Sequence, residues 1–147
     1  MEPNLRNAEH LGYKDAKANG LIESGILPLT DALYGRKCFP IASCEGHSYK
    51  HGYFNSIMDL ILKKHKPSYN PFVMFTCSMG LAKELSNKLF NNPALFYAWI
   101  ARATFNPSIG VLVWTLEPSD YRLAGGDVDI DKVKKDILQL SKVVKNL

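Results

Sequence analysis

The chain has 147 residues with 46% hydrophobic and 22% charged side chains and a net charge of +4. This composition is typical of a globular protein and excludes a disordered or fibrous one, and the length suits one ordinary domain. Three cysteines are too few for a secreted disulfide framework, and no run approaches the ~18 apolar residues of a membrane span. We therefore expect one soluble, cytoplasmic domain over residues 1–147, without a membrane anchor.

The N-terminal region is weakly patterned over residues 1–27, where the sequence suggests a helix around Leu5 to Asn19 that Gly20 closes. A second short helix is predicted from Pro28 to Tyr34. Proline suits a first helical turn, and leucines four residues apart share one helix face.

The first strand is predicted at Cys38 to Ser43, where Pro40 requires a sheet edge or a strand start. A helix from Asn55 or Ser56 to about Lys64 should follow. Phe72 to Cys77 is apolar at every position but one, which favours a central strand buried on both faces.

The C-terminal half contains two predicted helices and a predicted hairpin. Ser78 should cap a helix with an apolar side, and residues 97–117 should form a hairpin around Asn106 to Gly110. Its first arm is favoured as a strand, with a helix through Arg102 as the alternative. The apolar spacing from Ile130 to Val144 predicts an amphipathic helix. The order predicts an α+β fold, a two-layer sandwich in which a sheet of about four strands packs against helices.

One segment is typical of chemistry rather than packing, because Cys44-Glu45-Gly46-His47 directly follows a predicted strand. Gly46 permits a sharp turn that would aim its neighbours away from the sheet. In one hypothesis Cys44 is a thiolate nucleophile, His47 is its base, and Glu45 or Asp59 orients the imidazole.

A metal site is the second hypothesis, from Cys38, Cys44, His47 and His51. An extended strand would separate the two cysteines by roughly 20 Å, so only the smaller set of Cys44, His47 and His51 is compatible with one ion. No metal or cofactor is part of the favoured interpretation.

Recognition of a phosphate or a base is the third hypothesis. Lys50 and His51 would meet phosphate, while Tyr49 or Tyr53 stacks on a base. The structural alternative, favoured over each of the three, is that Cys44 packs as a small apolar residue and His47 fixes the turn.

Residues outside this loop have simpler interpretations. Arg102 lies on the predicted hairpin beside Trp99 and could bind a partner, although core packing is favoured for both tryptophans. Cys77, at the end of an apolar strand, is expected to be buried and inert.

Ser43 to His47, followed by Pro71 to Phe75, resembles a motif pair in short uncharacterised bacterial and phage proteins. Residues 41–89 are also similar to the tRNA wybutosine-synthesis methyltransferase family, in which a strand ends in Ser-Cys-x-Gly and a later Pro-Phe strand leads into a helix. That family has an arginine at the position of His47, so no substrate is carried over.

The favoured functional hypothesis is a small binding or regulatory protein of phage or mobile-element origin. It would act on a macromolecular partner, a protein rather than a nucleic acid, through residues 44–53 and the hairpin. Two alternatives stay open: a thiol- or metal-dependent enzyme that uses Cys44 and His47 on a small or nucleotide-like substrate, and an RNA-binding module.

Overall fold

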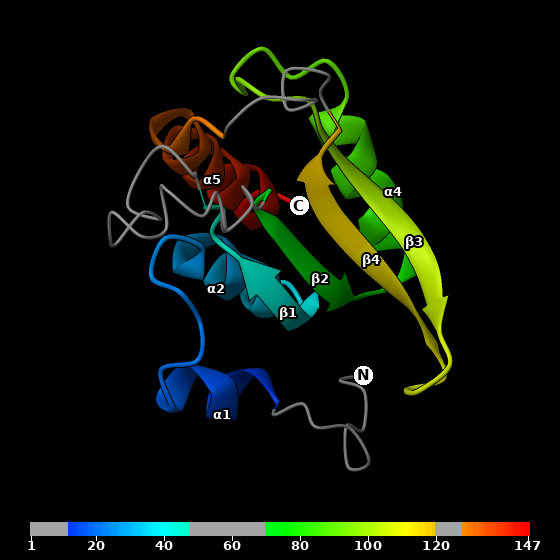
Figure 1. Cartoon of the computed structure of the whole chain (residues 1–147). Helices are drawn as coiled ribbons and strands as arrows, with labels where there is room; N and C mark the ends of the chain where they lie inside the picture. The colour runs from blue at the N-terminus through cyan, green and yellow to red at the C-terminus, as the bar shows by residue number, and fades with distance from the viewer. Residues whose placement is uncertain (1–11, 48–69, 120–127) are drawn as a thin grey trace, which may run out of the picture.

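The computed structural model describes residues 12–47, 70–119 and 128–147, which form four helices and four strands (Figure 1). The helices are α1 (Tyr13–Ala18), α2 (Leu27–Gly35), α4 (Met79–Leu89) and α5 (Ile130–Lys145). The strands are β1 (Phe39–Cys44), β2 (Phe72–Thr76), β3 (Trp99–Asn106) and β4 (Val111–Pro118).

The four strands form one antiparallel sheet in the order β1-β2-β4-β3. β1 is an edge strand, as its proline predicts, and its register with β2 shifts between Pro40 and Ala42. β2 is central, as predicted. However, only its Val73 and Phe75 side is completely buried, while Phe72 and Met74 are half-buried.

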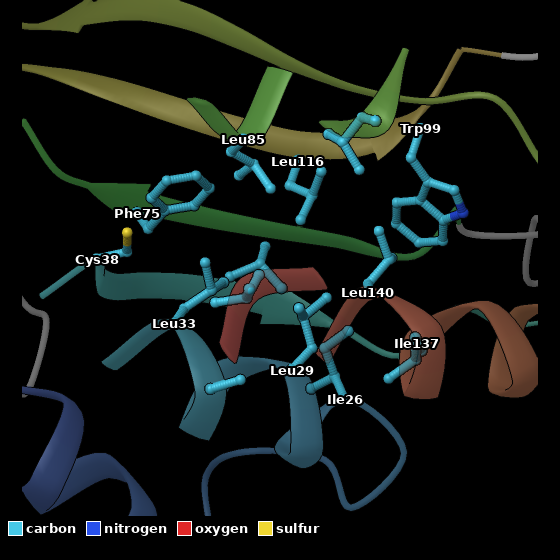
Figure 2. Packing of buried hydrophobic residues seen from close by; sticks show 14 of the residues in the cluster. Ile26, Leu29, Leu33, Cys38, Phe75, Leu85, Trp99, Leu116, Ile137 and Leu140 are labelled. Carbon is cyan, nitrogen blue, oxygen red and sulfur yellow. The ribbon is translucent and has the colours of Figure 1, made fainter. Parts of the chain in front are cut away.

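Helices α2, α5 and α4 pack against the face of the sheet that carries Val73 and Phe75 (Figure 1). Leu29 and Leu33 of α2 belong to the same buried core as Ile137 and Leu140 of α5 (Figure 2). The fold is therefore α+β with two layers, which confirms the sequence-based prediction.

Polar side chains begin both long helices, and Ser78 is the cap that the sequence predicts for α4. Ser78 Oγ accepts a hydrogen bond from Leu81 N, and an Asp129 carboxylate oxygen accepts one from Lys132 N. No helix in the described ranges is both long and apolar enough to cross a bilayer.

The N-terminal helix differs from its prediction. α1 begins at Tyr13 and ends at Ala18, and Gly20 adopts a positive φ of 67° just beyond it. The residues before Gly12 and the helix predicted after Asn55 lie outside the described residues.

The predicted hairpin is present, and its first arm is the strand β3 rather than a helix. Gly110, with a φ of 69°, closes the turn by donating its backbone N–H to the Asn106 carbonyl at 2.8 Å. This hairpin supplies the sheet edge opposite β1.

Candidate functional site

The loop between α1 and α2 brings an acidic residue to the end of β1. Gly20 reverses the chain after α1, and Leu21 N donates to the Ala16 carbonyl at 3.0 Å. Ile26, which is fully buried, ends the loop in the core. Glu23 lies between these two fixed points.

Two crossed hydrogen bonds join this loop to the residues after β1. Glu45 N donates to Glu23 Oε1 at 3.0 Å, and Gly25 N donates to Glu45 Oε2 at 2.7 Å. A Cβ atom on Gly25 would lie 2.4 Å from Glu45 Oε2. A side chain at position 25 would therefore force the Glu45 side chain to shift.

Gly46 makes the bend that the sequence predicts. Its φ is 86°, and a Cβ atom there would also lie only 3.1 Å from Pro71 Cδ. The Gly46 N–H donates to Cys44 Sγ at 3.4 Å. The bend returns His47 toward Cys44 and Glu23.

Glu23, Cys44 and His47 form a cluster of half-buried side chains, which we call the ECH cluster. His47 Nε2 lies 2.9 Å from Glu23 Oε2. One carboxylate oxygen, the thiol sulfur and one imidazole nitrogen all lie within 4.8 Å of one another. The side chains of His47 and Glu23 retain 28% and 36% of their exposure, so solvent reaches the cluster.

The surroundings of Cys44 favour its neutral thiol. Burial raises the pKa of Cys44, and the negative charges of Glu23 and Glu45 raise it further, against the opposing effect of the Gly46 N–H. In the metal-free protein Cys44 is therefore a protonated thiol at neutral pH.

The structure brings Cys44 and His47 together, but the carboxylate that pairs with His47 belongs to Glu23. Glu45, which the sequence offered for that role, instead accepts from Gly25 N. Glu23 was missed because it is far from Cys44 in the chain and belongs to a weakly patterned loop.

Other predicted site residues lie elsewhere. Tyr49, Lys50, His51, Tyr53 and Asp59 are outside the described residues.

Arg102 lies on β3, at the edge of the sheet opposite β1, and forms an ion pair with Glu117. It therefore belongs to a different surface from the ECH cluster. Trp99 is buried in the core, as expected, and Trp114 is partly buried against it.

Two cysteines lie outside the cluster. Cys38 is buried just before β1, at the opposite end of that strand from Cys44. Cys77 is half-buried rather than buried, which corrects the sequence-based expectation.

Comparison with known proteins gives no match among family models, curated proteins or solved structures.

Proposed function

We propose that the chain is a metal-dependent enzyme that binds one Zn²⁺-like ion through Glu23, Cys44 and His47. The observation that carries this proposal is the presence of three different ligand atoms within 4.8 Å of one another. Carboxylate, thiolate and imidazole are all ligands that zinc accepts, and three protein ligands leave a fourth position for water or substrate.

The spacing of the cluster supports the fit. Tetrahedral zinc with bonds of about 2.0–2.3 Å holds its ligand atoms roughly 3.5 Å apart. His47 Nε2 and Glu23 Oε2 are already 2.9 Å apart, so these two atoms need to separate by only a fraction of an ångström. The half-buried position allows the side chains to adjust while an ion enters from solvent.

The hydrogen bonds around these three side chains also support a metal site. Glu23 uses its other oxygen, Oε1, to accept from Glu45 N, which fixes the carboxylate plane. The bend at Gly46 and the Gly25–Glu45 hydrogen bond hold the two segments in register.

A free thiol nucleophile is the less favourable alternative for the same residues. Thiol enzymes lower the pKa of their cysteine with a nearby cation or a helix N-terminus. Here burial and two carboxylates raise the pKa of Cys44. A bound divalent cation reverses this balance, because a coordinated thiol loses its proton.

The chemistry of such a site is hydrolytic. A zinc ion with an open position lowers the pKa of bound water to about 7 and polarises a carbonyl or phosphoryl oxygen. Glu23, Cys44 and His47 would hold the ion, and we propose a small or nucleotide-like substrate.

Metal analysis of the full-length protein tests the proposal. We expect about one equivalent of Zn²⁺ per chain after purification without chelators. Replacement by Co²⁺ should give the visible bands of a four-coordinate ion and a sulfur-to-cobalt charge-transfer band. Less than about half an equivalent after zinc loading would contradict the proposal.

Matched variants identify the ligands. Glu23→Gln, Cys44→Ser and His47→Gln should each weaken zinc binding in a competition with a chromophoric chelator. Glu117→Gln and Cys77→Ser make the same types of substitution at residues outside the cluster. These two control variants should bind zinc like the parent protein. Equal zinc affinity in both groups of variants excludes the assigned ligand set.

A second candidate function, binding of a protein partner, is favoured by the end of the hairpin. Phe105 and Leu112 are Cα partners across β3 and β4, yet they retain 63% and 43% of their exposure. β3 is also a sheet edge, where an extended segment of another protein can add a strand.

Photo-crosslinking from position 103, an exposed residue on the same strand as Phe105, tests this second candidate. A crosslinked peptide from another protein supports this candidate if the crosslink is lost in a Phe105→Ser/Leu112→Ser variant. The control is Leu138→Ser, on the exposed side of α5, which should keep the crosslink. A crosslink to a second copy of the chain, or to nucleic acid with steep salt dependence, contradicts it.

A further inference from the structure

Cys38 and Cys77 occupy opposed positions at the end of the β1–β2 ladder. Phe39 is the Cα partner of Thr76, and Pro40 is the partner of Phe75. One further antiparallel step outward sets Cys38 against Cys77. Opposed residues in such a ladder have Cα atoms about 4.5–5.5 Å apart, within the range that a disulfide spans.

The side chains of this pair also meet. Cys77 packs against the buried cluster that contains Cys38. The interaction between the two thiols lowers the pKa of Cys38 and raises the pKa of Cys77. The β1–β2 register and the shared packing therefore make the two sulfur atoms neighbours.

Access to the pair is from one side. Cys38 is 1% exposed and lies beside Phe75 at one end of the core (Figure 2). Cys77 is half-buried and donates to the Ser78 carbonyl at 3.3 Å. A small oxidant therefore reaches the pair at Cys77, where the chain leaves β2 for α4.

We propose that Cys38 and Cys77 form a reversible disulfide when the protein meets a peroxide. Hydrogen peroxide converts one thiol to a sulfenic acid and releases water. The second sulfur then attacks the sulfenic sulfur, the S–S bond forms, the S–O bond breaks, and a second water leaves. Two thiols are oxidised by two electrons, and one peroxide is reduced to two waters.

The disulfide would tie the start of β1 to the end of β2 and close residues 38–77 into one loop. This loop contains Cys44, Gly46 and His47. The cross-link restricts the unfolded chain, so the oxidised protein should melt at a higher temperature than the reduced protein. The pair lies at the opposite end of β1 from Cys44, so the inference does not depend on metal binding.

Peroxide treatment of the reduced full-length protein tests the proposal. After treatment, free thiols are alkylated and the intact mass is measured. We expect the loss of two hydrogens and a single alkylated cysteine, Cys44, with one Cys38–Cys77 linked peptide after digestion. Dithiothreitol should restore three alkylated cysteines, and the Tm of the oxidised form should fall by about 5 °C or more on reduction.

Three single variants give the controls. Cys44→Ser should still lose two hydrogens, whereas Cys77→Ser should not. Cys38→Ala tests the buried partner, and its circular dichroism spectrum establishes that it folds. If Cys38→Ala does not fold, Cys77→Ser and the linked peptide of the parent decide the result. A linkage that includes Cys44, or equal alkylation of all three cysteines after peroxide, overturns the proposal.

Discussion

Trp99 Nε1 donates a hydrogen bond to Asp136 Oδ2 at 2.8 Å, joining the start of β3 to the middle of α5 inside the core. The same carboxylate accepts from Phe96 N at 2.7 Å and from Tyr97 N at 2.9 Å. Asp136 is 1% exposed. Asp136 therefore accepts from two backbone N–H groups just before β3 and from the Trp99 side chain at its start. One side chain thus joins α5 to β3.

Loss of this carboxylate should destabilise the protein strongly. Asp136→Ala leaves three donors without an acceptor, and we expect the free energy of unfolding to fall by about 3–5 kcal/mol. Urea denaturation followed by circular dichroism measures it.

Two further variants test the cause. Asp136→Asn keeps the shape but replaces one acceptor oxygen with a donor, so it should cost less than the alanine variant but more than about 1 kcal/mol. Lys135→Ala, at an exposed neighbour on the same helix, should change stability by no more than about 0.5 kcal/mol. An alanine variant at position 136 as stable as the parent would contradict the structural role.

Asp136 shows where sequence periodicity stops being informative. The spacing of Val133, Ile137 and Leu140 predicts α5 and its buried side correctly. A polar residue next to that stripe is ordinarily assigned to solvent, and its three partners are long-range contacts. Local patterns therefore predicted the α+β fold and the hairpin, while the polar contacts between elements required the tertiary structure.

The sequence likewise predicts one part of the ECH cluster and not the other. The bend at Gly46 and the proximity of Cys44 and His47 follow from four consecutive residues, so the sequence predicts them. Glu23 comes from a separate loop, and no spacing rule links it to Cys44. The Cys38–Cys77 pair likewise depends on the β1–β2 register, which the sequence does not specify.

Gly25 should be required for the geometry of the cluster. In Gly25→Ala the new methyl group would lie 2.4 Å from Glu45 Oε2, so the Glu45 side chain must move and lose the hydrogen bond from position 25. Under the proposed function, zinc affinity should fall by about 10–100-fold, as it does when a residue that holds a metal ligand in place is changed. A chelator competition measures the loss.

Gly80→Ala is the matched control for this substitution. Gly80 lies in the first turn of α4, and nothing lies within 4 Å of an added Cβ atom there. This variant should keep the zinc affinity of the parent and gain about 0.5 kcal/mol in stability. Equal zinc affinity for the two alanine variants would show that the Gly25 contact does not support the site.

Tyr13 should make the contact between α1 and α2 dependent on pH. Its hydroxyl donates to Asp31 Oδ1 and lies 3.1 Å from Thr30 Oγ1. Burial and the bond to Asp31 raise the pKa of Tyr13. A raised pKa means that the stabilisation is complete below the unfolded value of about 10 and is lost as the pH rises toward the folded value.

At acid pH the stabilisation depends on pH in the opposite direction, through Asp31. Burial raises the pKa of Asp31, but hydrogen bonds from Tyr13 and Lys17 outweigh it and lower the value overall. The stabilisation is therefore complete above the unfolded pKa and is lost as the pH falls through the lower, folded one.

Tyr13→Phe tests both the alkaline and the acid pH dependence of stability. It should lose about 1 kcal/mol at pH 7, and its stability should fall less steeply than that of the parent above pH ~10 and below pH ~4. Urea denaturation across the pH range measures this, with Tyr34→Phe, on a ring stacked on Tyr13, as the control for ring packing. Parallel curves for Tyr13→Phe and the parent would exclude the hydroxyl as the cause.

Metal binding to the ECH cluster should strengthen with pH, because an ion must displace the thiol proton of Cys44. Burial raises the pKa of Cys44, so the thiol stays protonated through the neutral range. Each proton released makes the apparent affinity rise about tenfold per pH unit until the pH passes that pKa. Cobalt titrations at several pH values between about 6 and 8.5 measure the slope.

A Cys44→Asp variant separates the thiol from the other ligands. An aspartate is ionised across this range, so the variant should lose about one proton from the slope while still binding the ion through oxygen. The charge-transfer band should disappear in the same variant, because it requires sulfur. An identical slope for the variant and the parent would mean that Cys44 releases no proton on binding, and Cys44 would then have to be removed from the ligand set.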